Sequence, residues 1–115
     1  MQANLIDAAL ALPDHRVSPR RARVAVAAWD QDVITLGTHA AMEVLGRNPN
    51  AIPRTIFLAS TTAPYAEGSN VAILAEALDL AGTGCTGFEI GSTMASGAAA
   101  TELALDRIVH GPVLV

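Results

Sequence analysis

The chain is poor in several kinds of residue, and each scarcity excludes a class of protein. Its single cysteine, Cys85, excludes an internal disulfide and a cysteine-based zinc cluster. Only 3% of the 115 residues are aromatic whereas 51% are hydrophobic, so aliphatic side chains must form the core. The longest apolar runs fall far short of the roughly 20 residues of a membrane span. The first residues, 1–7, contain no basic region typical of a signal peptide. We therefore expect a cytoplasmic protein that has no contact with a membrane.

Charged residues of both signs are mixed along the chain and give a net charge of −4. Nucleic-acid-binding domains usually carry a basic stripe, and this sequence has none. No spacing of His, Cys, Asp and Glu matches a metal site. Residues 82–84, Gly-Thr-Gly, do not open a helix after a strand, as a dinucleotide-binding loop must. We therefore expect no nucleic-acid partner, no metal and no bound cofactor.

Apolar and helical patterns alternate along what we expect to be a single domain. Continuous apolar runs predict strands over residues 5–12, 55–60, 88–91 and 112–115. Between them, helices are predicted after a cap at Asp30 or Asp32, after a cap at Ser69, and over residues 93–109. The segment 13–23, with two prolines and four arginines, predicts an exposed loop. The order β-α-β-α-β-α-β with apolar strands is typical of an α/β fold with a mostly parallel sheet.

Four segments carry a resemblance to a known family: Trp29–Gly37, Leu58–Tyr65, Leu74–Leu78 and Phe88–Ile90. In this order and spacing they resemble the N-terminal half of the thiolase-like superfamily. The nearest branch is the archaeal type of hydroxymethylglutaryl-CoA synthase, with type III ketoacyl-acyl-carrier-protein synthases further off. The resemblance implies that residues 1–115 form a partial thiolase-like N-terminal domain. Because the chain stops on an apolar strand, we expect it to be truncated, the opening portion of a longer fold.

The resemblance also implies a function and a position for the nucleophile. Members of the family transfer acyl groups or condense them on thioesters of CoA or an acyl-carrier protein, through a cysteine at a strand-to-helix turn. A gapless count from Phe88 places Ser92 at this position, and a slip of two residues places Met94 there. Thr61 stands where the hydroxymethylglutaryl-CoA synthase branch has a general-base glutamate. The family's catalytic His, and its His or Asn partner, belong to the C-terminal half.

The residues themselves also support plainer interpretations. Ser92 can be the N-cap of the third predicted helix, because serine accepts hydrogen bonds from the first backbone N–H groups of a helix. Met94 can be a packing residue. Cys85 lies in a glycine-rich loop before the strand predicted over residues 88–91, away from the strand-to-helix turn. We interpret it as an ordinary thiol. A serine hydroxyl is a poor nucleophile without a neighbouring base. We therefore expect no measurable condensation activity from the chain alone.

The resemblance allows a CoA phosphate to bind Arg20, Arg21 and Arg23, although a solvated basic loop explains these residues equally. It also implies assembly into homo- or hetero-oligomers with thiolase-like chains, and an OB-fold partner in some complexes. Two alternatives to an enzyme remain open. One is a non-catalytic subunit or pseudoenzyme of a multi-chain acyltransferase complex, and the other is a truncated reading frame without activity of its own. Apolar faces and an open strand edge predict that the chain is not a stable monomer.

Overall fold

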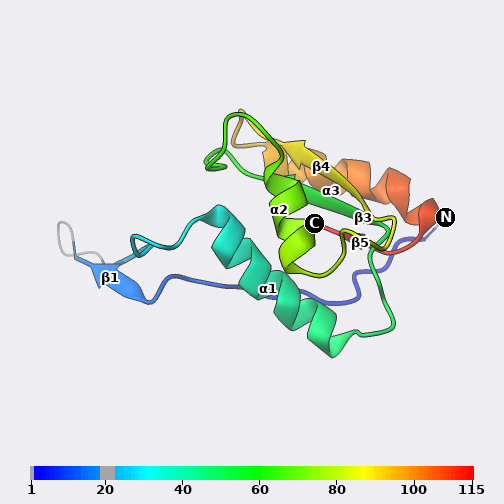
Figure 1. Ribbon diagram of the computed structural model, residues 1–115, viewed down its shortest axis with the longest axis horizontal. Helices are drawn as coiled ribbons and strands as arrows, with labels where there is room; N and C mark the ends of the chain where they lie inside the picture. The colour runs from blue at the N-terminus through cyan, green and yellow to red at the C-terminus, as the bar shows by residue number, and fades with distance from the viewer. Residues whose placement is uncertain (1, 19–22) are drawn as a thin grey trace.

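Figure 1 shows the computed structural model of the chain, which describes residues 2–18 and 23–115. Three helices and a three-stranded parallel sheet form the body of the molecule, and a two-stranded hairpin projects from it. The elements, in chain order, are β1 (His15–Val17), β2 (Val24–Val26), α1 (Val33–Arg47), β3 (Thr55–Ala59), α2 (Asn70–Ala77), β4 (Thr86–Ile90), α3 (Ser96–Arg107), a short 3-10 helix (Ile108–His110) and β5 (Val113–Leu114).

The sheet has the order β4-β3-β5, and both pairs are parallel. Strand β3 pairs along its whole length with β4, from Thr55 opposite Thr86 to Ala59 opposite Ile90. It pairs with β5 over two residues only. This arrangement confirms the predicted α/β class with a parallel sheet, and it confirms three of the four predicted strands.

The central strand divides two apolar clusters because successive side chains of a strand point to opposite faces. Ile56 and Leu58 lie on one face of β3 and pack with Val71 and Leu74 of α2. Phe57 lies on the other face, where it packs with two small residues of α3, Ala100 and Ala104. The small alanines let α3 approach the sheet closely, which suits a core almost without aromatic residues. The result is a three-layer α/β/α body (Figure 1).

Two of the three predicted helix starts are confirmed by their caps. The Asp32 carboxylate accepts a hydrogen bond from the backbone N–H of Thr35 at 2.8 Å, and this bond lowers the pKa of Asp32. The Ser69 hydroxyl accepts from the N–H of Ala72 at 3.1 Å. The third helix is different, because α3 begins at Ser96 and its N-cap residue, Ala95, makes no side-chain cap hydrogen bond.

The strand predicted over residues 5–12 is wrong. This segment is extended but pairs with no strand, and its large side chains Leu5, Ile6, Leu10 and Leu12 are exposed. A strand needs a pairing partner as well as apolar residues, and the described sheet consists of β4, β3 and β5 without this segment. The segment is held instead by α1, where Arg47 forms an ion pair with Asp7 at 2.8 Å.

The loop predicted over residues 13–23 contains a strand that the sequence did not indicate. His15–Val17 pairs antiparallel with Val24–Val26, so the two form a hairpin, β1-β2. Both strands are exposed along most of their length, and Figure 1 shows the hairpin projecting from the end of the molecule away from the parallel sheet. Three residues per strand give too short an alternation for a sequence pattern to detect.

Candidate functional site

The carboxyl ends of β3 and β4 meet at one edge of the sheet, because the two strands are parallel and in register. Ligands of open α/β sheets bind at this edge. The Ser60 N–H, just after β3, donates to the carbonyl oxygen of Ile90 at 3.0 Å. A Cβ placed on Gly91 would lie 2.9 Å from the carbonyl oxygen of Ser60. A glycine is therefore required at position 91, where the chain after β3 packs directly against the start of the β4–α3 turn.

Ser92 occupies this turn in a backbone conformation that serine rarely adopts. Its φ angle is +74°, in the left-handed region, and its side chain is exposed. Outside glycine such conformations are uncommon, and they cluster at functional sites. The interpretation of Ser92 as an N-cap is wrong, since α3 begins four residues later and Ala95 is the cap residue. The structure thus places Ser92 at the strand-to-helix turn, but as a strained turn residue.

The rest of the turn is fixed by short hydrogen bonds between small residues. The Ser96 hydroxyl, which is 5% exposed, donates to the carbonyl oxygen of Thr93 at 2.6 Å. The Thr93 hydroxyl in turn accepts from the N–H of Ala95 at 3.1 Å. No side chain caps α3, and the Ser96 N–H donates to the Thr93 carbonyl oxygen at 3.2 Å. An anion or a developing oxyanion at this end of the helix would therefore meet the next N–H groups, those of Gly97 and Ala98. Met94 is 95% exposed, so the interpretation of Met94 as a packing residue is wrong for this chain.

Cys85 lies at the other end of β4, before Thr86, and is half-buried against the α2 cluster. Burial raises the pKa of its thiol, which keeps it in the protonated, less reactive form at neutral pH. Thr61, in the loop after β3, is exposed and brings no carboxylate to the site. Neither Cys85 nor Thr61 therefore provides a general base beside Ser92.

The structure describes only one of the three arginines predicted to bind a CoA phosphate. Arg20 and Arg21 lie outside the described residues. Arg23 is exposed immediately before β2, on the hairpin that projects from the sheet. Nothing in the described part of the chain brings Arg23 to the Ser92 turn.

Two residues near the turn were not singled out by the sequence. Glu89 of β4 and Asn70, the first residue of α2, join their side chains at 2.8 Å. Asn70 is 2% exposed although it is polar. A buried polar residue at the first position of a helix leaves no periodic signal. Glu89 lies in the Phe88–Ile90 segment that carries the family resemblance, but nothing in that segment indicates its pairing with Asn70, which required the structure.

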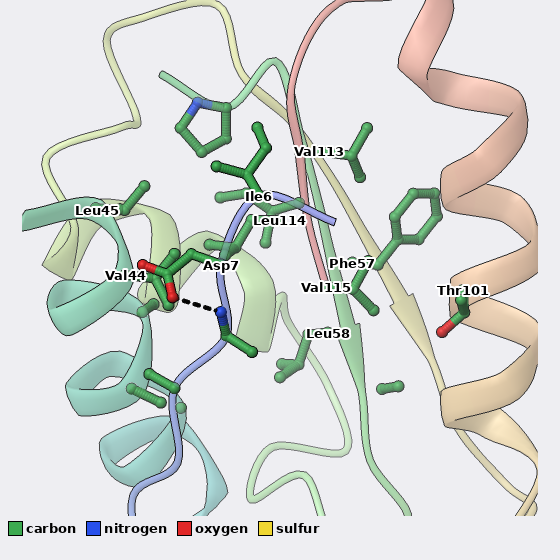
Figure 2. A pocket seen from close by; sticks show the side chains of 18 of the residues that line it. Ile6, Asp7, Val44, Leu45, Phe57, Leu58, Thr101, Val113, Leu114 and Val115 are labelled. Carbon is green, nitrogen blue, oxygen red and sulfur yellow. Dashed lines mark hydrogen bonds between the residues drawn. The ribbon is translucent and has the colours of Figure 1, made fainter. Parts of the chain in front are cut away.

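A cavity of about 1520 Å³ lies between the N-terminal segment, α1 and the sheet. Figure 2 shows the N-terminal segment, which carries Ile6 and Asp7, passing between α1 and the sheet, where Leu58, Val113 and Val115 are labelled. The volume exceeds the range of about 300–1,000 Å³ typical of small-molecule pockets. The lining is mainly apolar, and the dashed bond in Figure 2 joins Asp7 to its neighbouring N–H. We therefore place the candidate site at the Ser92 turn.

Within residues 2–18 and 23–115, the structure places no three His, Cys, Asp or Glu side chains close enough to hold a metal ion. In the same part of the chain, no helix is long and apolar enough to cross a membrane.

Comparisons with known proteins find relatives by structure and none by sequence. No protein-family model matches the chain, and no curated protein matches it. The structure is similar to 3-oxoacyl-[acyl-carrier-protein] synthase III from Aquifex aeolicus VF5, with a TM-score of 0.78 and 17% identity. It is similar to β-ketoacyl-[acyl-carrier-protein] synthase III from Thermus thermophilus, with a TM-score of 0.81 and 13% identity.

The alignments cover 91% and 94% of this chain but only 40% and 39% of the two synthases. The chain thus spans about two fifths of the length of the structures it matches. At these identities the likeness shows the fold, and this fold is the one expected from the residues. The chain has the α/β architecture of part of a thiolase-like fold, as found in ketoacyl synthases of type III.

Proposed function

We propose that this chain supplies the nucleophile-bearing side of a site that transfers acyl groups from thioesters of CoA or an acyl-carrier protein. The observation that carries the proposal is the backbone of Ser92, an exposed serine held at φ +74° between the end of β4 and a helix without a side-chain cap. Nucleophiles of acyl-transfer enzymes are often presented on strained strand-to-helix turns of this kind. The similarity of the fold to two ketoacyl synthases supports the same function.

In the proposed step, the Ser92 hydroxyl oxygen attacks the carbonyl carbon of the thioester. The negative charge that develops on the carbonyl oxygen is stabilised by backbone N–H groups at the start of α3. The carbon–sulfur bond then breaks, an oxygen ester forms on Ser92, and the hydroxyl proton leaves with the thiol. Because a serine hydroxyl needs a neighbouring base, we propose that another chain, or a segment outside residues 2–18 and 23–115, supplies it. The chain alone should therefore show no measurable condensation with acetyl-CoA or acetoacetyl-CoA.

The proposal is tested by comparing thiols at the two candidate positions. In a Cys85→Ser background, Ser92→Cys and Met94→Cys are each incubated with acetyl-CoA and examined by intact-protein mass spectrometry. A thiol at position 92 should gain one acetyl group faster than a thiol at position 94, because only position 92 has the strained turn geometry. Equal acylation of the two would count against Ser92. In the unmodified chain, an adduct on Cys85 would place the nucleophile at the wrong end of β4 and overturn the assignment.

Within the thiolase-like superfamily, we propose acyl transfer of the ketoacyl synthase III type. Thr61 stands where the hydroxymethylglutaryl-CoA synthase branch has its glutamate, and both solved structures named above are ketoacyl synthases. A role for Arg20, Arg21 and Arg23 in holding the phosphates of CoA belongs to this proposal. Replacing the three together by glutamine should weaken CoA binding in the competent assembly if the role is correct.

Exposed apolar side chains favour a second candidate, a non-catalytic subunit of an acyltransferase assembly. Trp29 is 98% exposed, Met94 95% and Leu5 88%, and a partner chain could cover these large side chains. Partners of the proposed kind are further thiolase-like chains, identical or different, and a small OB-fold protein. Sedimentation at micromolar concentration tests this directly. Self-association or aggregation would support the assembly, whereas a monodisperse monomer with a cooperative thermal transition would contradict it.

A further inference from the structure

One network of hydrogen bonds ties the loop after β3 to the strand that leads into the Ser92 turn. Asn70 is at its centre and uses its whole side-chain amide. Its oxygen accepts from the N–H of Tyr65 at 3.0 Å, and its nitrogen donates to the Tyr65 carbonyl oxygen at 2.9 Å. The same nitrogen donates to one carboxylate oxygen of Glu89 at 2.8 Å. The second Glu89 oxygen accepts from the backbone N–H of Asn70 at 2.9 Å.

Strand geometry explains why Glu89 can reach this position. Gly87 and Glu89 lie on the same face of β4, two residues apart, and a Cβ on Gly87 would lie 2.9 Å from Val71 of α2. That face of the strand is therefore the α2 face, and Glu89 meets the N-terminus of the helix. A carboxylate there is favoured by the helix dipole and satisfies a backbone N–H that the helix cannot. The Ser69 hydroxyl satisfies another, so Glu89 acts as a second cap from outside the helix.

The network also connects to the candidate site at the opposite end of the same loop. Ser60 begins the loop and bonds to Ile90, the residue after Glu89, at 3.0 Å. The Ser60 carbonyl oxygen lies where a side chain on Gly91 would have to pass. The loop over residues 60–69 is therefore held at both ends by β4 and its continuation. Its first residue packs against the turn that carries Ser92.

We infer that Glu89 and Asn70 are positioning residues: by clamping the backbone of Tyr65, they hold the 60–69 loop against Gly91 and so set the access of a reagent to Ser92. The inference rests on the proposed function for its purpose, but the clamp itself can be measured without any acyl transfer. The Glu89 carboxylate accepts two hydrogen bonds from Asn70, and such charge-assisted bonds are stronger than bonds between neutral groups. Neither residue touches the substrate in this proposal.

The clamp can be broken from either side by nearly isosteric changes. Glu89→Gln places an amide NH₂ group against the amide of Asn70, and Asn70→Asp places a second carboxylate against Glu89. The double variant Glu89→Gln/Asn70→Asp restores a donor facing an acceptor, although the Tyr65 carbonyl loses its partner. Glu67→Gln is the matched control, because Glu67 lies in the same loop and takes no part in the network described above.

Two measurements are made on each variant, in a background carrying Cys85→Ser and Ser92→Cys. The first is amide hydrogen exchange at Tyr65 and Asn70, which should become about tenfold faster in each single variant, as expected for the loss of one good hydrogen bond. The second is the rate of alkylation by iodoacetamide at position 92, which should rise several-fold. The double variant should recover part of both effects, and Glu67→Gln should change neither.

Each other outcome overturns the inference. Unchanged exchange at Tyr65 would show that the clamp does not hold the loop. Faster exchange with unchanged alkylation would show that the loop is held but does not control the turn. Equal damage in the single and double variants would indicate general loss of packing, with no specific pairing of Glu89 and Asn70. Because iodoacetamide needs no acyl-transfer chemistry, failure of acetyl-CoA to acylate position 92 would count against the proposed function and leave this result standing.

Discussion

Residues 2–32 and residues 55–107 are both rich in apolar side chains, yet only the later region buries them. In the later region, Ile56, Phe57 and Leu74 are each less than 5% exposed. In the earlier region, no residue of the described ranges 2–18 and 23–32 is buried. The segment around Leu10 has a composition as apolar as that of β3, but Leu10 is 76% exposed.

The difference shows that burial depends on available partners more than on composition. Strand β3 has a strand on each side and a helix on each face, so each of its side chains meets a surface. The N-terminal segment has one neighbour, α1, and a cavity of about 1520 Å³ on its other side. A bound extended chain or an added domain would change the environment of this segment and leave β3 as it is.

The largest effect is expected from Ile56→Ala. Ile56 is 1% exposed in the central strand, and removing a buried side chain of this size costs about 2–5 kcal/mol of unfolding free energy. The matched change Leu10→Ala, in the N-terminal segment, should cost less than about 0.5 kcal/mol. Urea unfolding of both variants at one fixed protein concentration measures the contrast. Comparable losses in the two would mean that the N-terminal segment is packed in solution and that the contrast between the regions is wrong.

Part of this contrast could be predicted from the sequence. The apolar run at Thr55–Ala59 and the caps Asp32 and Ser69 gave the correct elements, because their signals are local: side-chain period and side-chain-to-backbone hydrogen bonds. The run over residues 5–12 has the same local signal and is not a strand, because pairing depends on residues far away in the chain. The strand His15–Val17 was missed for the opposite reason, because its three residues are too short to give a local sequence pattern.

The next largest effect is expected at Gly87, where close packing between β4 and α2 depends on the absence of a side chain. A Cβ there would lie 2.9 Å from Val71, so Gly87→Ala must push α2 away and should cost about 1–3 kcal/mol. The matched change is Gly46→Ala in α1, where a Cβ would meet nothing within 4 Å. This change should stabilise the chain by about 0.5–1 kcal/mol through helix propensity. In thermal unfolding, Gly87→Ala should lower the melting temperature and Gly46→Ala should raise it.

The double variant Gly87→Ala/Val71→Ala tests the cause of the first effect. Since the smaller residue at position 71 makes room for the new methyl group, the double variant should recover part of the loss expected from the added Cβ. If the two losses simply add, the cost at Gly87 arises elsewhere, for example in the backbone of β4, and close approach to α2 is not its reason.

In the candidate site, too, the sequence predicted the features that depend on neighbouring residues and missed those that depend on distant contacts. The strand-to-helix turn followed from the strand predicted over residues 88–91 and the helix predicted after it, and the place of Ser92 in the turn followed from the family resemblance. The left-handed backbone of Ser92 and the start of α3 at Ser96 did not, because no periodic or capping pattern in the sequence indicates either of them. Glu89 and Asn70 are 19 residues apart in the chain, and the packing of α2 on β4 brings them together.

The smallest effect on overall stability is expected from Asp7→Asn, which removes the tether of the N-terminal segment. Both oxygens of Asp7 bind Arg47, at 2.8 and 2.9 Å, and Asn48 adds a third bond at 2.8 Å. The pair is solvent-exposed, so the unfolding midpoint should hardly move. The segment itself should become mobile, which a spin label at Gln2→Cys in the Cys85→Ser background would report. Glu43→Gln, which removes the other carboxylate bound to Arg47, should leave the label as it was.

The mobility of the same spin label, followed as a function of pH, tests whether the Asp7 carboxylate holds the N-terminal segment. Hydrogen bonds from Arg47 hold the pKa of Asp7 well below its ordinary value of 3.8. A carboxyl group with a lowered pKa in the folded state stabilises that state above its unfolded pKa, and this contribution is lost as the pH falls through the folded pKa. The label should therefore stay immobile as the solution is acidified through pH 3.8 and be released only in stronger acid. Release with a midpoint at the ordinary carboxyl pKa would show that Asp7 is not bound to Arg47 in solution, and the N-terminal region would then differ from the core even more than the structure indicates.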